Sequence, residues 1–227
     1  MFSLLKEVNN TDKNIMTIED PIEIKMEGIN QIAVTPKMPF ERALKSILRQ
    51  DPDIIMIGEM RDNETAEIAV KASMTGLLVI STLHTNDAIS SVNRLIKMGI
   101  SPLMVADSLN VVVNQRLVRK LCENCKVEDK ASLKILKKDY PEYFKNTDKI
   151  FTSKGCEKCN FAGYFGRIPI QEILCFDDNL RRVILSGDEK ELDKYKGDKK
   201  ILKDSFYKIK QGLTDYKEVR EVLNGIL

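Results

Sequence analysis

The stretch DIIMIGEMRD, residues 53–62, is a short apolar run that ends in a glycine and an acid. Residues 54–57 (IIMI) carry no polar side chain, which is typical of a strand buried on both faces of a sheet. Gly58 and Glu59 follow this run directly. Burial of a charged group is costly unless it has a partner, so a carboxylate in this place indicates a site at the end of the strand.

Two further apolar runs end in polar side chains. Residues 15–18 lead into Glu19 and Asp20, where Pro21 prevents a central strand from continuing. Residues 77–82 lead into His84. Helices are predicted between and after these runs by the spacing of apolar residues, by caps such as Asp62, and by the pair Ser101-Pro102; they cover residues 40–48, 62–72 and 88–98 and the segment after 101. Alternating strands and helices predict an α/β fold with a mostly parallel sheet covered on both sides.

The carboxyl ends of parallel strands meet at one edge of a sheet, where ligands bind. We therefore expect Glu19, Asp20, Glu59 and His84 to converge there. Carboxylates after strands are often only helix caps, and a lone histidine is more often structural than functional. For Glu19 and Glu59, the expected convergence on one edge favours a catalytic role.

Four of the five cysteines form two CxxC pairs that are separated by 30 residues: Cys122 with Cys125, and Cys156 with Cys159. Two tight turns that each present two thiolates predict a closed tetrahedral zinc site, which is structural because it leaves no open position for catalysis. Four unrelated buried thiols are the alternative. A redox CxxC would normally stand alone. Cys175, in an apolar segment, is interpreted as a buried core residue.

The overall composition restricts the partners of the chain. Its 227 residues contain 36 Lys and Arg against 34 Asp and Glu, and the charges are interspersed. A nucleic-acid binder would show a clustered basic face, so no nucleic-acid partner is expected. No apolar stretch reaches the ~18 residues that span a bilayer, and a secretory leader is absent, so we expect a cytoplasmic protein.

The composition changes along the chain and suggests three parts. We expect an α/β core at 1–118, a metal-binding subdomain at 119–165, and a C-terminal strand and helical subdomain at 166–227. The strand is expected at the segment RIPIQEIL (167–174). Asp178, Asp204 and Thr214 are the expected helix caps of the C-terminal part.

Several segments together resemble the C-terminal part of the secretion ATPases that drive type II secretion and type IV pilus assembly. Their order and spacing match that family over most of the chain. The matching segments are TIEDPIE (17–23), RQDPDIIMIGEMRDNETA (49–66), TGLLVISTLHTNDA (75–88), QRLVRKLCENCK (115–126) and GCEKCNFAGYFGRIPIQEIL (155–174).

The resemblance implies a RecA-like P-loop NTPase core, binding of ATP and Mg²⁺, assembly as a homo-hexamer, and docking to an inner-membrane secretion or pilus platform. It implies that TIEDPIE is the aspartate box, DIIMIGE the Walker B segment and TLHT the histidine box. The cysteine pairs resemble the metal-binding subdomain of the assembly branch, which pilus retraction motors lack. We would then expect a cytoplasmic ATPase peripheral to the inner membrane.

The resemblance also implies roles for single residues. Glu59 would hold the attacking water, and Glu19 would assist it or reach the magnesium shell. His84 would hydrogen-bond the γ-phosphate and sense its loss. Gly58 stands where many Walker B segments carry an acid. The residues expected to contribute to binding of the nucleotide and its metal ion are Asp20, Arg49, Arg61 and Thr82, although surface ion pairs are an equal reading for the two arginines.

The family's glycine-rich loop GxxxxGK[ST], which cradles phosphates, does not occur in this sequence. We expect the chain to start just downstream of that loop and to be inactive alone. This leaves two other function classes. One is an ATP-incompetent, zinc-stabilised interaction module or degenerate gene product, and the other, weaker one is a zinc-containing nucleic-acid binder.

Overall fold

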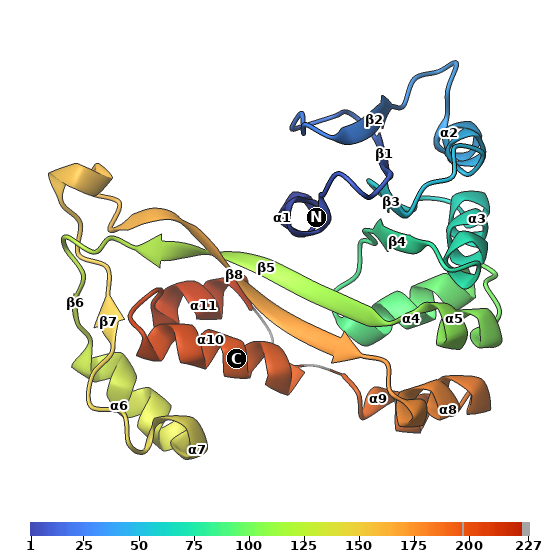
Figure 1. Ribbon diagram of the computed structural model, residues 1–227. Coiled ribbons are helices and arrows are strands. Elements are labelled where there is room, and N and C mark those ends of the chain that lie inside the picture. Colours follow the sequence, from blue (N-terminus) through green and yellow to red (C-terminus); the bar gives the residue numbers. More distant parts are fainter. Residues whose placement is uncertain (197, 224–227) are drawn as a thin grey trace. The chain divides into compact units, whose positions relative to one another are not determined.

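The computed structural model describes residues 1–196 and 198–223. Contacts group the chain into a first unit, Met1–Val111 with Cys175–Tyr195, and a second unit, Val112–Leu174 with Lys196–Leu227 (Figure 1). The division into three parts at 118 and 165 stays a prediction. Five residues of its C-terminal part, Gly197 and residues 224–227, lie outside the described residues.

The first unit is built on a parallel sheet of four strands in the order β2-β1-β3-β4. Ile15 pairs with both Ile29 and Ile54, and Ile54 pairs with Leu78, so all four strands run in the same direction and end at the same edge. The predicted α/β fold with a parallel sheet is therefore confirmed. The strands are β1 (Ile15–Glu19), β2 (Ile29–Ala33), β3 (Ile54–Ile57) and β4 (Leu78–Ser81).

Helices cover both faces of this sheet (Figure 1). On one face, Leu44 and Ala69 pack against Ile18 and Ile57 of the central strands. On the other face, Leu5 is buried with Ile15, Ile54 and Met56. The helices of the first unit are α1 (Phe2–Val8), α2 (Phe40–Ile47), α3 (Asn63–Met74), α4 (Ala88–Lys97), α5 (Pro102–Ser108), α8 (Asp178–Ser186) and α9 (Glu189–Asp193).

Side-chain caps fix where these helices begin. The Asp62 carboxylate accepts a hydrogen bond from the Thr65 backbone N–H, and the Ser101 hydroxyl accepts one from that of Met104, as predicted. The prediction for α8 is wrong by one residue: Asp177 is its cap, and Asp178 is the first helical residue. None of the helices in the described part of the chain has the length and apolar character that crossing a bilayer requires.

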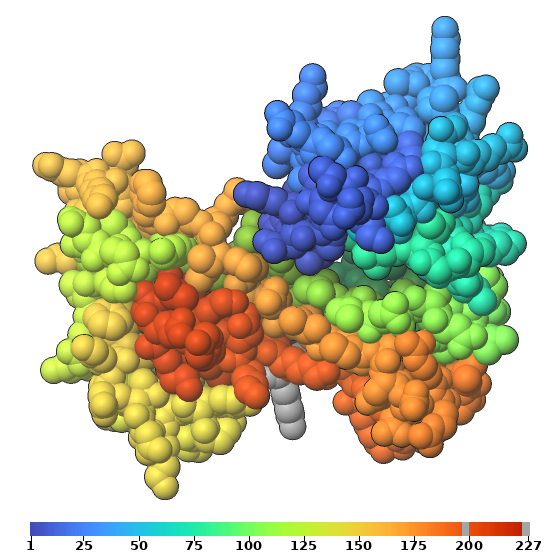
Figure 2. All heavy atoms as spheres, viewed as in Figure 1, coloured from blue at the N-terminus to red at the C-terminus, as the bar shows by residue number. Residues whose placement is uncertain are grey.

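The second unit is organised around two long paired strands, β5 and β8. Val118 of β5 and Ile170 of β8 are buried in one core with Leu136, Phe144 and Phe206, which come from three helices. In Figure 2 the spheres of α10 and α11 (red) lie directly against those of α6 and α7 (yellow). The elements are β5 (Val111–Leu121), β6 (Val127–Glu128), α6 (Lys130–Asp139), α7 (Pro141–Phe144), β7 (Phe151–Thr152), a 3₁₀ turn (Glu157–Cys159), β8 (Tyr164–Cys175), α10 (Asp198–Lys210) and α11 (Tyr216–Val222).

Buried polar side chains attach α11 to the strands. Asp215, not Thr214, caps α11, and its carboxylate also accepts hydrogen bonds from the Tyr164 hydroxyl (2.9 Å) and the Thr152 hydroxyl (3.1 Å). The Thr214 hydroxyl instead donates to the Arg119 carbonyl oxygen at 2.9 Å. The cap of α11 therefore lies one residue after the expected position, at Asp215 instead of Thr214.

Asp204 is also not a cap. It lies inside α10, and its carboxylate accepts a hydrogen bond from the Gln171 backbone N–H of β8 at 2.9 Å. Inside a helix the backbone N–H groups already donate to carbonyl oxygens of the same helix. The Asp204 carboxylate therefore accepts from an N–H group of the neighbouring strand.

Replacing Glu218 by alanine should lower the free energy of unfolding by about 1.5–3 kcal/mol, because hydrogen bonds to a charged partner are lost. Buried Glu218 accepts from the Arg119 backbone N–H at 2.8 Å and from its guanidinium Nε at 2.7 Å, and this contact raises the pKa of Arg119. Glu221 is the matched control, since it is exposed and 3.6 Å from the same guanidinium. Its replacement by alanine should change stability by less than about 0.5 kcal/mol. Equal effects in urea unfolding would contradict the prediction.

Candidate functional site

Four of the predicted site residues meet at the carboxyl edge of the sheet. Glu59 Oε1 lies 2.8 Å from His84 Nε2, and Glu59 Oε2 lies 2.5 Å from Arg61 Nε. Arg61 Nη1 in turn lies 3.3 Å from Asp20 Oδ2. The bond to Glu59 raises the pKa of Arg61. Residues that follow β1, β3 and β4 are thus joined in one chain of polar contacts, as the strand ends predicted.

The backbone around Glu59 is held by both neighbouring strands. The Gly58 N–H donates to the Ile18 carbonyl oxygen at 2.8 Å, and the Met60 N–H donates to that of Thr82 at 3.1 Å. A Cβ atom at residue 58 would lie only 3.2 Å from the Ile18 oxygen. The close approach of β1 explains why this position holds a glycine and not an acid.

Glu19 is buried at the end of β1, with 3% of its surface exposed. Its Oε1 accepts hydrogen bonds from the Thr17 hydroxyl at 2.6 Å and from Gln31 Nε2 at 2.9 Å. These partners satisfy a carboxylate that would otherwise be costly to bury. Sequence reasoning missed both partners. Thr17 could have been found because side chains two apart on a strand share a face, but Gln31 lies on β2, which was not predicted.

His84 and Thr82 differ in their surroundings. The His84 side chain contacts Glu59 and is still 86% exposed, so it can also contact a ligand. The Thr82 hydroxyl donates to the Gly58 carbonyl oxygen at 2.7 Å and so helps to hold the segment that carries Glu59.

Arg49 is the predicted site residue that the structure does not bring to this edge. It is exposed and lies between α2 and β3, before the start of that strand. Four residues of β3 separate it from Glu59, and at about 3.3 Å per residue they span about 13 Å. Within this unit Arg49 therefore lies at the opposite edge of the sheet.

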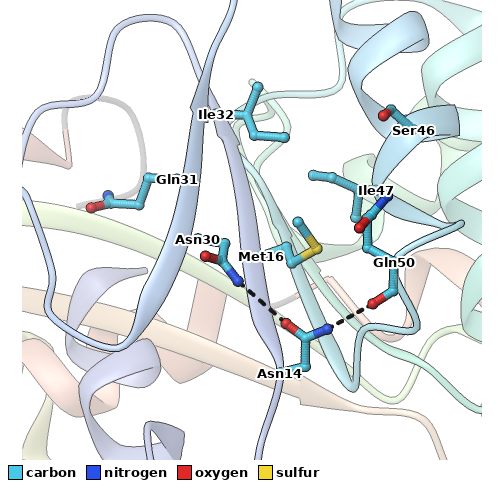
Figure 3. A pocket seen from close by; sticks show the side chains of 8 residues that line it. All are labelled: Asn14, Met16, Asn30, Gln31, Ile32, Ser46, Ile47 and Gln50. Atoms are coloured by element: carbon cyan, nitrogen blue, oxygen red, sulfur yellow. Dashed lines mark hydrogen bonds between the residues drawn. The ribbon is translucent and has the colours of Figure 1, made fainter.

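Two cavities lie beside the sheet. One, of ≈ 500 Å³, is at the carboxyl edge, where Asp20 and Arg61 face the first turns of α2 and α3. The other, of ≈ 460 Å³, lies between β1, β2 and α2 and is lined only by uncharged residues (Figure 3). In that cavity Asn14 Nδ2 donates to the Gln50 carbonyl oxygen at 2.8 Å. The first cavity is next to the predicted site, and its charged lining consists of Arg61 and four acids, which are Asp20, Glu41, Asp62 and Glu64.

The four paired cysteines converge as predicted. Their Sγ atoms all lie within 4.8 Å of one another, with Cys122 to Cys156 at 4.0 Å and Cys125 to Cys159 at 3.8 Å. Four sulfurs at 2.3 Å from a tetrahedral zinc ion are separated by about 3.8 Å. The thiols therefore fit a zinc ion without rearrangement. Each pair sits in a tight turn. The Cys125 N–H donates to the Cys122 carbonyl oxygen at 3.2 Å, and the Cys159 N–H donates to the Cys156 carbonyl oxygen at 3.1 Å.

Backbone and side-chain N–H groups support the thiols of the second pair. Gly163 N–H donates to Cys159 Sγ at 3.2 Å, and Asn124 Nδ2 lies 3.7 Å from Cys156 Sγ. Burial raises the pKa of Cys125 to about 12. Burial also opposes ionisation of Cys156, but hydrogen bonds from the backbone and from Asn124 lower its pKa to about 6. Burial likewise opposes ionisation of Cys159, but hydrogen bonds from backbone N–H groups lower its pKa.

Cys175 is exposed, so its interpretation as a buried core residue is wrong. It ends β8, and the residues of this strand alternate between buried and exposed positions from Ile170 onward. Its neighbour Leu174 is the buried member of the pair. The apolar segment therefore has one buried side, not two.

A family model described as type II/IV secretion system protein matches residues 1–221. The type IV pilus assembly ATPase PilB of Thermus thermophilus is 46% identical over 225 residues, which cover 96% of this chain and 25% of that protein. The type II secretion system ATPase E of Vibrio cholerae is 45% identical over 227 residues, which cover 98% of this chain and 45% of that protein. The chain thus spans less than half the length of these curated relatives.

Solved structures share the fold. The pilus retraction motor PilT, crystallised with bound ADP, superposes with a TM-score of 0.68 and 26% identity over 98% of this chain and 56% of that one. The ATPase DotB of Legionella pneumophila gives a TM-score of 0.65 at 21% identity, over 98% of this chain and 55% of that one, which shows likeness of fold.

Proposed function

The chain belongs to the family of type II/IV secretion system proteins, and on this premise we propose that it is part of a hexameric ATPase that powers type II protein secretion or type IV pilus assembly. The observation that carries the proposal is the polar chain Asp20–Arg61–Glu59–His84 beside buried Glu19 at the carboxyl edge of the parallel sheet. A carboxylate that orients water, further carboxylates that can hold a magnesium shell, and donors for phosphate oxygens are groups that phosphoryl transfer to water uses.

ATP with Mg²⁺, when bound, supplies the γ-phosphoryl group that water attacks. Arg61 and His84 carry N–H donors that suit phosphate oxygens. Both donors contact Glu59 in this structure. When they turn to a phosphate, the carboxylate of Glu59 becomes free to orient and deprotonate water. Glu19 stays fixed by Thr17 and Gln31 and assists the water or the magnesium shell.

The remaining residues have supporting roles in this proposal. Asp20 lies within reach of the metal shell, and Thr82 holds the Glu59 segment through the Gly58 carbonyl oxygen. Arg49 lies at the opposite edge of the sheet from this site. It would therefore contact a neighbouring subunit, or the nucleotide bound by another copy of the chain. The zinc ion at the four cysteines has a structural role, since all four tetrahedral positions are filled by protein.

The proposal extends to assembly and location. As one subunit of a homo-hexamer, the chain would act in the cytoplasm and bind the inner-membrane platform of a secretion or pilus system. The relatives that support this share 45–46% of the aligned residues and carry these systems in their names.

The test is a PilB chimera, in which the matching segment of Thermus thermophilus PilB is replaced by residues 1–227 of this chain. We expect magnesium-dependent ATP hydrolysis by the chimera within about tenfold of PilB itself. PilB without its matching segment is the negative control. A folded chimera without hydrolysis would overturn the proposal.

A second candidate is an interaction module that does not hydrolyse ATP. It is favoured by Glu59, whose two oxygens are both satisfied by the protein. Calorimetry on the chain alone separates the two candidates in part, since tight ATP binding would argue against this one.

A further inference from the structure

The side-chain amide of Gln31 joins the buried acid Glu19 to the loop that follows it. Gln31 Nε2 donates to Glu19 Oε1 at 2.9 Å and to the Ile24 carbonyl oxygen at 2.9 Å. Gln31 Oε1 accepts from the Met26 backbone N–H at 2.8 Å. A glutamine amide has two N–H donors and one oxygen, so these contacts use every polar atom of the side chain.

The register of the sheet places Gln31 there. Gln31 of β2 is paired with Thr17 of β1 in the parallel register, and Glu19 lies two residues further along β1. Side chains two apart share a face of a sheet, so Thr17 and Glu19 point to the side that Gln31 occupies. Figure 3 shows the side chains of Gln31 and Asn30 on opposite sides of β2, and both residues belong to the lining of the uncharged cavity.

Thr17 and Gln31 donate to the same oxygen of Glu19, Oε1. The other oxygen, Oε2, has no partner in the described part of the chain. Two donors on Oε1 therefore fix the plane of the carboxylate and leave Oε2 as the atom that can accept a hydrogen bond from water or bind a metal ion. Such positioning of a reacting group contributes to rate without contact with the substrate.

Resting on the proposed function, we propose that Gln31 is a positioning residue for ATP hydrolysis, which orients Glu19 so that Oε2 faces the reaction. Its bonds to Ile24 and Met26 make the 24–26 segment the support of this amide. Gln31 itself touches neither nucleotide nor water in this role.

Two substitutions separate positioning from support. Gln31→Leu removes all three hydrogen bonds. Gln31→Glu keeps the acceptor for the Met26 N–H but replaces the nitrogen that donates to Glu19 Oε1 and to the Ile24 carbonyl oxygen by a carboxylate oxygen. Asn30→Leu is the matched control, because Asn30 is the adjacent amide on the other side of β2.

In the chain itself, hydrogen exchange at the Met26 amide should be at least tenfold faster in Gln31→Leu and unchanged in Gln31→Glu and Asn30→Leu. In the PilB chimera, both Gln31 variants should lower the turnover number at least tenfold, with the KM for ATP unchanged and the fold retained, and Asn30→Leu should retain full turnover. Loss of turnover in Gln31→Glu with intact Met26 protection is a result that a merely structural role would not produce.

Three results would overturn the inference, and they are distinguishable. Unchanged Met26 exchange in Gln31→Leu overturns the contact itself. Wild-type turnover of Gln31→Glu in an active chimera overturns positioning and leaves the proposed function intact. A folded chimera that is inactive with the unchanged chain overturns the proposed function, and the positioning role with it.

Discussion

Replacing Glu59 by glutamine in the PilB chimera is expected to lower the turnover number for ATP by about 10²–10⁴-fold, the usual contribution of a group that accepts a proton from the nucleophile. Glutamine has the shape of glutamate and can still contact His84 and Arg61, so the fold of this edge should be retained. It cannot accept a proton from water. The KM for ATP should therefore remain within a few-fold of that of the unchanged chimera.

The control for this substitution is Glu67→Gln. Glu67 is an exposed residue of α3 that pairs with Lys71 at 2.6 Å on the helix surface, and its neutralisation should leave turnover unchanged. Full activity of Glu59→Gln would remove Glu59 from the mechanism and leave Glu19 as the acid that activates water.

Glu19→Gln distinguishes the two roles proposed for Glu19. If Glu19 reaches the magnesium shell, the substitution should raise the Mg²⁺ concentration for half-maximal hydrolysis. If it assists the water, the turnover number should fall at saturating Mg²⁺. A variant unchanged in both quantities would contradict any part for Glu19 in hydrolysis.

Removal of the metal is the second change for which a large effect is expected. Chelation, or Cys122→Ser, should accelerate hydrogen exchange on the order of 100-fold at residues 122–126 and 156–163, which corresponds to about 3 kcal/mol. The reason is that metal binding and local folding are one equilibrium when a site has little core of its own. Exchange in β1 and β3 of the first unit should remain unchanged, because their core contains none of these residues.

Helices α6 and α7 should keep most of their protection on metal removal. Their buried residues Leu136 and Phe144 share a core with Phe206 of α10. The ring centroids of Tyr140, Tyr143 and Phe144 lie 4.8–5.2 Å from that of Phe206. Cys175→Ser is the matched control, since Cys175 is exposed and outside the cluster. Unchanged exchange at 122–126 after chelation would contradict a structural metal.

The metal affinity should also fall with decreasing pH, because the metal binds thiolates and competes with protons. Zinc should therefore be released as the pH is lowered. A chromophoric chelator would measure this release. The variant Asn124→Ala removes the hydrogen-bond donor near Cys156 Sγ, so zinc release from it should begin at higher pH than from the unchanged chain.

The sequence by itself determined the parallel sheet, the edge at which Glu59 and His84 meet, and the convergence of the four cysteines. Each depends on local signals: a fully apolar run such as residues 54–57, or two CxxC turns that one ion can bind. Those signals lie within a few residues, and the parallel direction of the strands then places their ends together.

Only the tertiary structure revealed β2 and β5, because strands with one exposed side, such as the segment that contains Asn114 and Arg116, are interrupted by polar residues and show no apolar run. It alone decided that Gln31 binds Glu19 and that Cys175 is exposed. It also placed Arg49 at the opposite edge from Glu59. These facts depend on which strands are neighbours, in which register, and on which side is covered, and each of these is fixed by packing between segments distant in the sequence.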